Sequence, residues 1–321
     1  MQHLESLDFH DLFLGETPES CYIKHPKFNG RVEAVPPEYY DTLAQMYQQI
    51  NHEMSDDTHD NDFHYVYEDI HFRVERMLVS GNRPMYVCRR FLSEMPSLSV
   101  LGFPDPMVRN LTNPKLKSGL ILMCGAAGSG KTTSAYSLIL QRIQKHGGVA
   151  WTIENPIEIP MIDRWGNGLF YQQEVVSDQD FEDIMKRVLR SNPDMILVGE
   201  IRGYDSLKVA VTAAMSGHLV VTTLHASDIE SALFRCASWL GSDLAIGNPW
   251  GLLSEALSGI FHLTMKVQED KEPPIVIKTS SLWVDESGMN NSRQVRDALR
   301  KGELSIIKTE INNQARFFGL N

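Results

Sequence analysis

The 321-residue sequence has only four cysteines, and they lie far apart in the chain. None belongs to a C-x-x-C pair, which argues against a zinc knuckle, a redox dithiol and a dense disulfide framework. We therefore expect a folded protein of a reducing compartment, the cytoplasm. The four positions are Cys21, Cys88, Cys124 and Cys236.

Basic residues are also scarce relative to acidic ones. The chain has 30 Lys and Arg against 41 Asp and Glu, a formal net charge of −11. A protein of this sign does not attract nucleic acid or an anionic membrane through its overall charge, so we expect no nucleic-acid partner. Most of the acidity is N-terminal, because residues 1–100 carry a net charge of −9.

A long hydrophobic run is missing as well. The stretch Val209–Ser227 has no Asp, Glu, Lys or Arg, but Gly217 and His218 interrupt it and it carries several hydroxyls. The N-terminus MQHLESLDFHDLF lacks the basic and apolar regions of a signal peptide. We therefore expect no direct membrane span.

Strand-length apolar runs alternate with helical segments beyond residue 118, which predicts an α/β fold with a mostly parallel sheet. Earlier, short alternating runs and one helix over Pro37–Ile50 predict a smaller α+β domain. Prolines between the two indicate a linker. We thus expect domains at residues 1–100 and 119–321, a linker at 101–118, and a helical C-terminal part from about residue 249.

The sequence GAAGSGKT at residues 125–132 satisfies the phosphate-loop pattern G-x-x-x-x-G-K-S/T and lies between an apolar run and a helical one. Its glycines let backbone N–H groups surround a phosphate, Lys131 would neutralise phosphate charge, and Thr132 would offer a hydroxyl to Mg²⁺. The alternative is a plain glycine-rich turn. We predict a site for ATP and Mg²⁺ at Gly125, Ala126, Ala127, Gly128, Ser129, Gly130, Lys131, Thr132 and Thr133.

Acidic residues follow two of the later predicted strands. Glu200 ends the run MILVGE, the form of a Walker B element that orders Mg²⁺, although an exposed acid after a buried strand would look alike. Glu154 and Glu158 flank Pro156, and either could orient the attacking water. His225 ends the run LVVTTLH and could sense the γ-phosphate, or it could simply be a packed residue.

Four segments in this order resemble the secretion or traffic ATPases of the PilT/GspE family: GAAGSGKTT, TIENPIE, NPDMILVGEIR and TAAMSGHLVVTTLH. The resemblance implies a RecA-like ATPase domain behind a PAS-like N-terminal domain. It further implies a hexameric ring that hydrolyses ATP in the cytoplasm, peripheral to the inner membrane, where a platform protein of a pilus or secretion machine is its partner. It is compatible with pilus assembly, retraction and secretion.

The same resemblance assigns roles to individual residues. It makes Glu158 the catalytic glutamate, Glu200 the Walker B acid, and His225, with His218, part of a histidine box. Arg73 and Arg89 stand where the family supplies arginines to the phosphates. Both lie in or beside the acid-free stretch from Arg76 to Ser93, which indicates a nearby anion or, alternatively, an ion-paired surface.

Two positions depart from the family pattern. Asn155 stands where the family commonly has Asp, and Gln173 replaces a usual arginine. These changes leave open a non-catalytic subunit that binds ATP and only organises a partner. A nucleic-acid-dependent RecA-like motor is the other alternative, against which the acidic composition counts.

Overall fold

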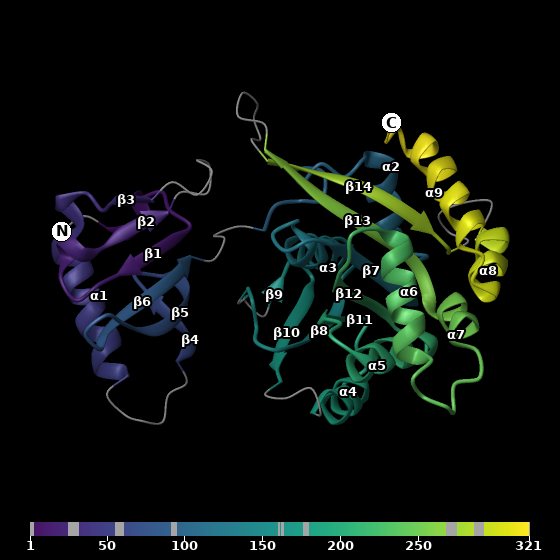
Figure 1. The fold of residues 1–321 in the computed structure, drawn as a ribbon, viewed down its shortest axis with the longest axis horizontal. Helices are drawn as coiled ribbons and strands as arrows, with labels where there is room; N and C mark the ends of the chain where they lie inside the picture. The colour runs from purple at the N-terminus through teal and green to yellow at the C-terminus, as the bar shows by residue number, and fades with distance from the viewer. Residues whose placement is uncertain are drawn as a thin grey trace. The chain divides into compact units, whose positions relative to one another are not determined.

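The computed structural model describes residues 3–24, 32–54, 61–90, 95–159, 161, 164–175, 180–267, 275–285 and 292–320. The chain divides into two compact units, Met1–Glu94 and Met95–Asn321 (Figure 1).

The first unit combines an antiparallel sheet with the helix α1 (Tyr40–Glu53). The strand order is β3-β2-β1-β6-β5-β4. The apolar face of α1 shares one core with alternate residues of the strands, such as Phe72 and Val74, so the opposite sheet face carries the polar residues between them. The strands are β1 (Asp11–Leu14), β2 (Tyr22–Lys24), β3 (Val32–Ala34), β4 (Asp62–Tyr67), β5 (Ile70–Val79) and β6 (Arg83–Arg90).

The second unit contains a sheet in the order β14-β13-β7-β12-β11-β8-β10-β9. Its six neighbouring strands from β13 to β10 run parallel, while β14 and β9 are antiparallel to their neighbours. The strands are β7 (Gly119–Gly125), β8 (Gly148–Glu154), β9 (Arg164–Trp165), β10 (Gly168–Glu174), β11 (Met195–Glu200), β12 (Leu219–His225), β13 (Leu257–Val267) and β14 (Ile275–Trp283).

Helices cover both faces of this sheet. Successive residues of β7 belong to different core clusters: Leu120 and Leu122 pack with α5, whereas Ile121 and Met123 pack with α3. Such a strand is apolar throughout because it has no solvent-facing side. The helices are α2 (Asp105–Leu111), α3 (Lys131–His146), α4 (Phe181–Arg190), α5 (Tyr204–Met215), α6 (Ile229–Leu240), α7 (Pro249–Ala256), α8 (Ser292–Lys301) and α9 (Leu304–Phe318).

The predicted α/β class, with a mostly parallel sheet preceded by a smaller α+β unit, is confirmed. Two stretches differ from expectation. Residues 101–118, predicted as a linker, include the helix α2. Its Met107 and Leu111 are buried in the same core cluster as Ile121 and Met123 of β7. The part after residue 249 is not wholly helical, because β13 and β14 extend the sheet there before α8 and α9. Among the described helices, none has the length and apolar character needed to cross a membrane.

Candidate functional site

Four neighbouring parallel strands, β7, β12, β11 and β8, end at the same edge of the second unit's sheet. In the strand register, His225 at the end of β12 lies beside Gly125 at the end of β7, and Thr223 lies beside Glu200 of β11. Ligands of open α/β sheets bind outside these carboxyl ends. The fold therefore gathers the predicted phosphate loop, Walker B acid and histidine at one edge.

The phosphate loop turns through two glycines in left-handed conformations, Gly128 with φ 71° and Gly130 with φ 86°. A side chain would be strained at either position. At Gly130 an added Cβ would also lie 2.5 Å from Cδ1 of Ile277. The glycines of the motif are thus required by the backbone path from β7 into α3.

The beginning of α3 has the features of an anion site. Gly130 provides no side-chain cap, so the first N–H groups of the helix are available to a ligand. Just before it, the Ser129 hydroxyl is buried and has no hydrogen-bond partner within the described part of the chain. A buried hydroxyl without a partner is costly, so the loop fits a phosphate that would supply one.

Lys131, the first residue of α3, points its ammonium back over the loop. Its Nζ donates to the carbonyl of Ala126 at 2.8 Å and lies 3.4 Å from Nδ1 of His225. Burial lowers the pKa of Lys131, while the nearby carboxylates of Glu200 and Glu158 act in the opposite direction. The ammonium is thus in a buried position where phosphate oxygens would stabilise its charge.

Glu200 is held on both sides by cationic or potentially cationic groups. Its Oε1 lies 2.9 Å from Nε2 of His225, and its Oε2 accepts a hydrogen bond from Nε of Arg202 at 3.0 Å. Arg202 also donates through Nη2 to the main-chain carbonyl of Asn155 at 3.2 Å. The carboxylate at the end of β11 is therefore linked both to β12 and to the loop after β8.

The two glutamates of that loop have different surroundings. Glu154 is 2% exposed and accepts hydrogen bonds from neighbouring side chains, whereas Glu158 is exposed. Burial raises the pKa of Glu154, and hydrogen bonds from Tyr136 and Gln172 oppose that rise. Of the two carboxylates that the sequence left as alternatives, only Glu158 is free to face solvent.

Arg73 and Arg89 lie in the first unit, directly opposite each other on β5 and β6. Arg73 forms an ion pair with Asp62, Nη2 to Oδ2 at 2.5 Å, and Nε of Arg89 donates to Oδ1 of Asp11 at 2.8 Å. The arginines therefore form an adjacent pair on one sheet face, and each already has a carboxylate partner.

Asp11 itself is buried, and its ionisation depends on its neighbours. Burial alone would raise the pKa of its carboxyl, but hydrogen bonds from His10 and Arg89 lower it from 3.8 to about 2. The carboxylate is consequently charged at neutral pH and offsets the Arg89 charge.

His218 precedes β12, whereas His225 ends it, so the strand separates the two histidines. His218 is at the amino end of the parallel strands, opposite the phosphate loop, and its buried Nδ1 has no partner among the described residues. The structure thus brings His225, and not His218, to Lys131 and Glu200.

The role of Arg202 was not anticipated from the sequence. Arg202 is the last residue of the segment NPDMILVGEIR. Only the three-dimensional structure shows that its guanidinium reaches both Glu200 and the Asn155 carbonyl. The hydrogen bonds that Tyr136 and Gln172 make with Glu154 were likewise missed. The signal for them was weak, because the three residues are far apart in the sequence.

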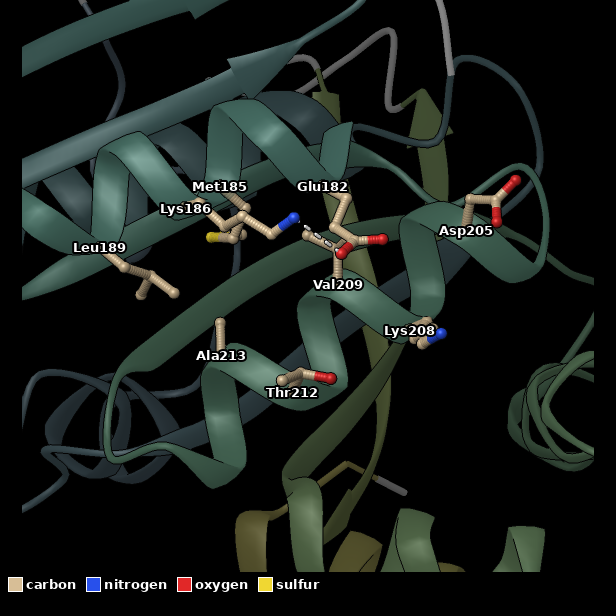
Figure 2. Close-up of a pocket in the computed structure, with 9 residues that line it drawn as sticks. All are labelled: Glu182, Met185, Lys186, Leu189, Asp205, Lys208, Val209, Thr212 and Ala213. Atoms are coloured by element: carbon tan, nitrogen blue, oxygen red, sulfur yellow. Dashed lines mark ion pairs between the residues drawn. The ribbon is translucent and has the colours of Figure 1, made fainter. Parts of the chain in front are cut away.

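A separate cavity of about 380 Å³ lies between α4 and α5 (Figure 2). Its floor is apolar, with Met185, Val209 and Ala213, and its rim bears Lys186, which pairs with Glu182 at 3.0 Å. The lining contains no residue of the phosphate loop. This groove is thus distinct from the edge of the sheet where the predicted site residues meet.

The family of type II/IV secretion system proteins matches residues 59–316 of the sequence. The chain belongs to this family. Among its relatives, the type IV pilus ATPase PilU of Pseudomonas aeruginosa is 33% identical over 224 residues, which cover 69% of this chain and 55% of PilU. The competence protein ComGA of Bacillus subtilis is 36% identical over 163 residues, or 50% of this chain and 42% of ComGA.

The fold of this family member is also found in a solved structure. A crystal structure of the pilus retraction motor PilT with bound ADP superposes with a TM-score of 0.72 at 24% identity, covering 95% of this chain and 86% of PilT. The likeness shows the fold that the family resemblance implied. The chain spans only about half the length of the curated relatives PilU and ComGA.

Proposed function

We propose that the chain binds MgATP at residues 125–133 and hydrolyses it as a motor subunit of a type IV pilus or secretion machine. The observation that carries the proposal is the cluster at one sheet edge: the phosphate loop with its unpartnered Ser129 hydroxyl, the buried Lys131, and Glu200 with His225. The names of the relatives, a pilus ATPase among them, support it.

In this proposal the loop and Lys131 bind the phosphates. The first N–H groups of α3 and the Lys131 ammonium favour negative charge at the same point. The hydroxyl of Thr132 and, through water, Glu200 would hold Mg²⁺. The bound ion would neutralise charge on the β- and γ-phosphate oxygens.

Glu158 would orient the attacking water, because it is exposed and its charge acts on Lys131. His225, in contact with both Lys131 and Glu200, would respond to the γ-phosphate. Arg73 and Arg89 would add positive charge to the transferred phosphoryl group, once phosphate oxygens replace Asp62 and Asp11 as their partners.

We further propose that the working form is a hexameric ring in the cytoplasm, bound to a platform protein at the inner membrane. Support comes from the family, whose description names type II and type IV secretion systems. Hydrolysis would then change contacts within the ring and produce mechanical work.

The proposal is tested by phosphate release from MgATP with purified protein, comparing wild type with Lys131→Ala. Lys145→Ala is the matched control, because Lys145 is exposed in the last turn of the same helix. We expect phosphate release from wild type and Lys145→Ala only. A mass measurement with and without nucleotide should show that a hexamer forms when nucleotide is bound. Binding without release would instead indicate a nucleotide-gated subunit, and strong stimulation by single-stranded DNA would indicate a nucleic-acid motor.

A further inference from the structure

Three side chains from three different elements meet beneath the loop that carries Glu158. Glu154 ends β8, Tyr136 lies in α3 and Gln172 lies in β10. The Tyr136 hydroxyl donates to Oε1 of Glu154 at 2.5 Å, and Nε2 of Gln172 lies 2.9 Å from the Tyr136 oxygen and 3.4 Å from the same Oε1. Tyr136 and Glu154 are both buried, so this is an internal polar network.

Three donors face the carboxylate of Glu154. Besides Tyr136 and Gln172, the main-chain N–H of Glu158 points to Oε2 at 3.5 Å. A buried carboxylate is stable only with such partners. Glu154 is therefore unavailable to activate water, and its hydrogen bonds restrain the residue that is exposed, Glu158.

Gln172 forms hydrogen bonds with the main chain of the same loop after Glu158. Its Oε1 accepts from the N–H of Met161 at 2.7 Å, and its Nε2 lies 3.0 Å from the carbonyl of Ile159. Together with the contact to the Glu158 N–H, the network holds the main chain at three points around Glu158. These contacts restrict the movement of the main chain from which the Glu158 side chain extends.

The network also joins the loop to the two motifs proposed to bind MgATP. Tyr136 is in the same helix as Lys131, five residues later. On the other side, Glu154 packs against Gly199, the residue before Glu200, where an added Cβ would lie 3.1 Å from Cγ of Glu154. Glu154 is thus at the junction of the phosphate-loop helix, the Walker B strand and the Glu158 loop.

We infer that Glu154 is a positioning residue, which Tyr136 and Gln172 hold in place and which in turn fixes the position of Glu158, from which it orients the attacking water. The inference rests on the proposed function. It assigns these three residues no contact with nucleotide, so their loss should slow the chemical step and leave nucleotide binding unchanged.

The first test is Tyr136→Phe, which removes the hydroxyl and keeps the ring that packs on Phe170 at 5.7 Å between centroids. We expect kcat for ATP hydrolysis to fall at least about tenfold, since small displacements of a reacting group are costly, with KM changed less than about twofold. The control is Tyr171→Phe, one position before Gln172, where the ring packs on Trp151 instead. An unchanged kcat, or a matching rise in KM, would overturn the inference.

Amide hydrogen exchange gives a readout that does not depend on activity. Tyr136→Phe should speed exchange at the N–H groups of Glu158 and Met161 about tenfold, because a restraining hydrogen bond is lost. The melting temperature should fall by a few degrees, because the buried Glu154 carboxyl group keeps fewer donors. Gln172→Met, which removes the contacts to Tyr136, Ile159 and Met161, should do the same and replaces Tyr136→Phe if that variant does not fold. Unaltered exchange in a folded variant would contradict the inference.

Inactivity of the wild-type protein would overturn the proposed function alone, and the exchange result would still decide whether the network holds the loop.

Discussion

His225 connects Lys131 to Glu200 through the two nitrogens of one imidazole ring. Nδ1 lies 3.4 Å from Nζ of Lys131, and Nε2 lies 2.9 Å from Oε1 of Glu200. In the proposed reaction Lys131 contacts phosphate oxygens and Glu200 orders Mg²⁺. The imidazole therefore contacts both residues at once.

The first prediction concerns Glu200. Glu200→Gln keeps the shape of the side chain but removes the charge that pairs with Arg202 and that, in the proposed function, would order Mg²⁺. We expect ATP binding to persist and phosphate release to fall at least about 100-fold. Glu182→Gln, a change at an exposed glutamate of α4, is the control. Wild-type turnover in Glu200→Gln would remove Glu200 from the site.

The second prediction concerns the arginine pair. Arg73→Ala and Arg89→Ala should each lower phosphate release at least about 100-fold without preventing folding, because each would lose one charge on the transferred phosphoryl group. Arg83→Ala is the matched control, since Arg83 is exposed at the start of β6 and its Nε donates to the Ser80 carbonyl at 3.2 Å. Equal rates in all three variants would leave Arg73 and Arg89 as ion-paired surface residues.

The third prediction concerns the backbone of the phosphate loop. Gly130→Ala places a side chain at φ 86°, which should cost about 1 to 2 kcal/mol in the free energy of unfolding and weaken nucleotide binding. Gly247→Ala is the control, because no atom of the described residues lies within 4 Å of a Cβ built there. Urea unfolding and nucleotide titration measure both effects. Unchanged affinity in Gly130→Ala would show that the loop tolerates another path.

The fourth prediction is a pH dependence of stability. The folded-state pKa of Asp11, about 2, is below its ordinary 3.8, so its carboxylate stabilises the fold above about pH 4 and this contribution is lost as pH falls towards 2. Asp11→Asn should therefore lower the free energy of unfolding by about 2 kcal/mol at pH 7 and by roughly half as much at pH 3. Asp8→Asn, at an exposed position, is the control. A pH-independent difference would contradict this account.

Much of the fold was predictable because the pattern is regular. The apolar run before GAAGSGKT becomes β7, and the periodic segment after it becomes α3. Prediction failed after residue 249, where β13 and β14 form. β13 pairs with β7, which lies far earlier in the chain, and local sequence does not encode that partner; β14 then pairs with the neighbouring β13.

The site was predictable to the extent that its residues belong to contiguous motifs. Lys131, Glu200 and His225 each end or begin a recognisable element, and parallel strand order then brings them together. Arg202 was not predictable in this way, because its contacts depend on where its side chain turns after the strand. The Tyr136 and Gln172 network depends on tertiary packing between α3 and β10.

The most direct test of the account is a single-turnover measurement on Glu158→Gln. Protein is loaded with ATP, Mg²⁺ is added, and conversion of bound ATP to ADP is followed beside wild type. We predict that wild type converts its bound ATP while Glu158→Gln binds ATP equally well and retains it, slowed at least about 100-fold. Conversion at the same rate in both proteins would contradict the central claim that Glu158 orients the attacking water.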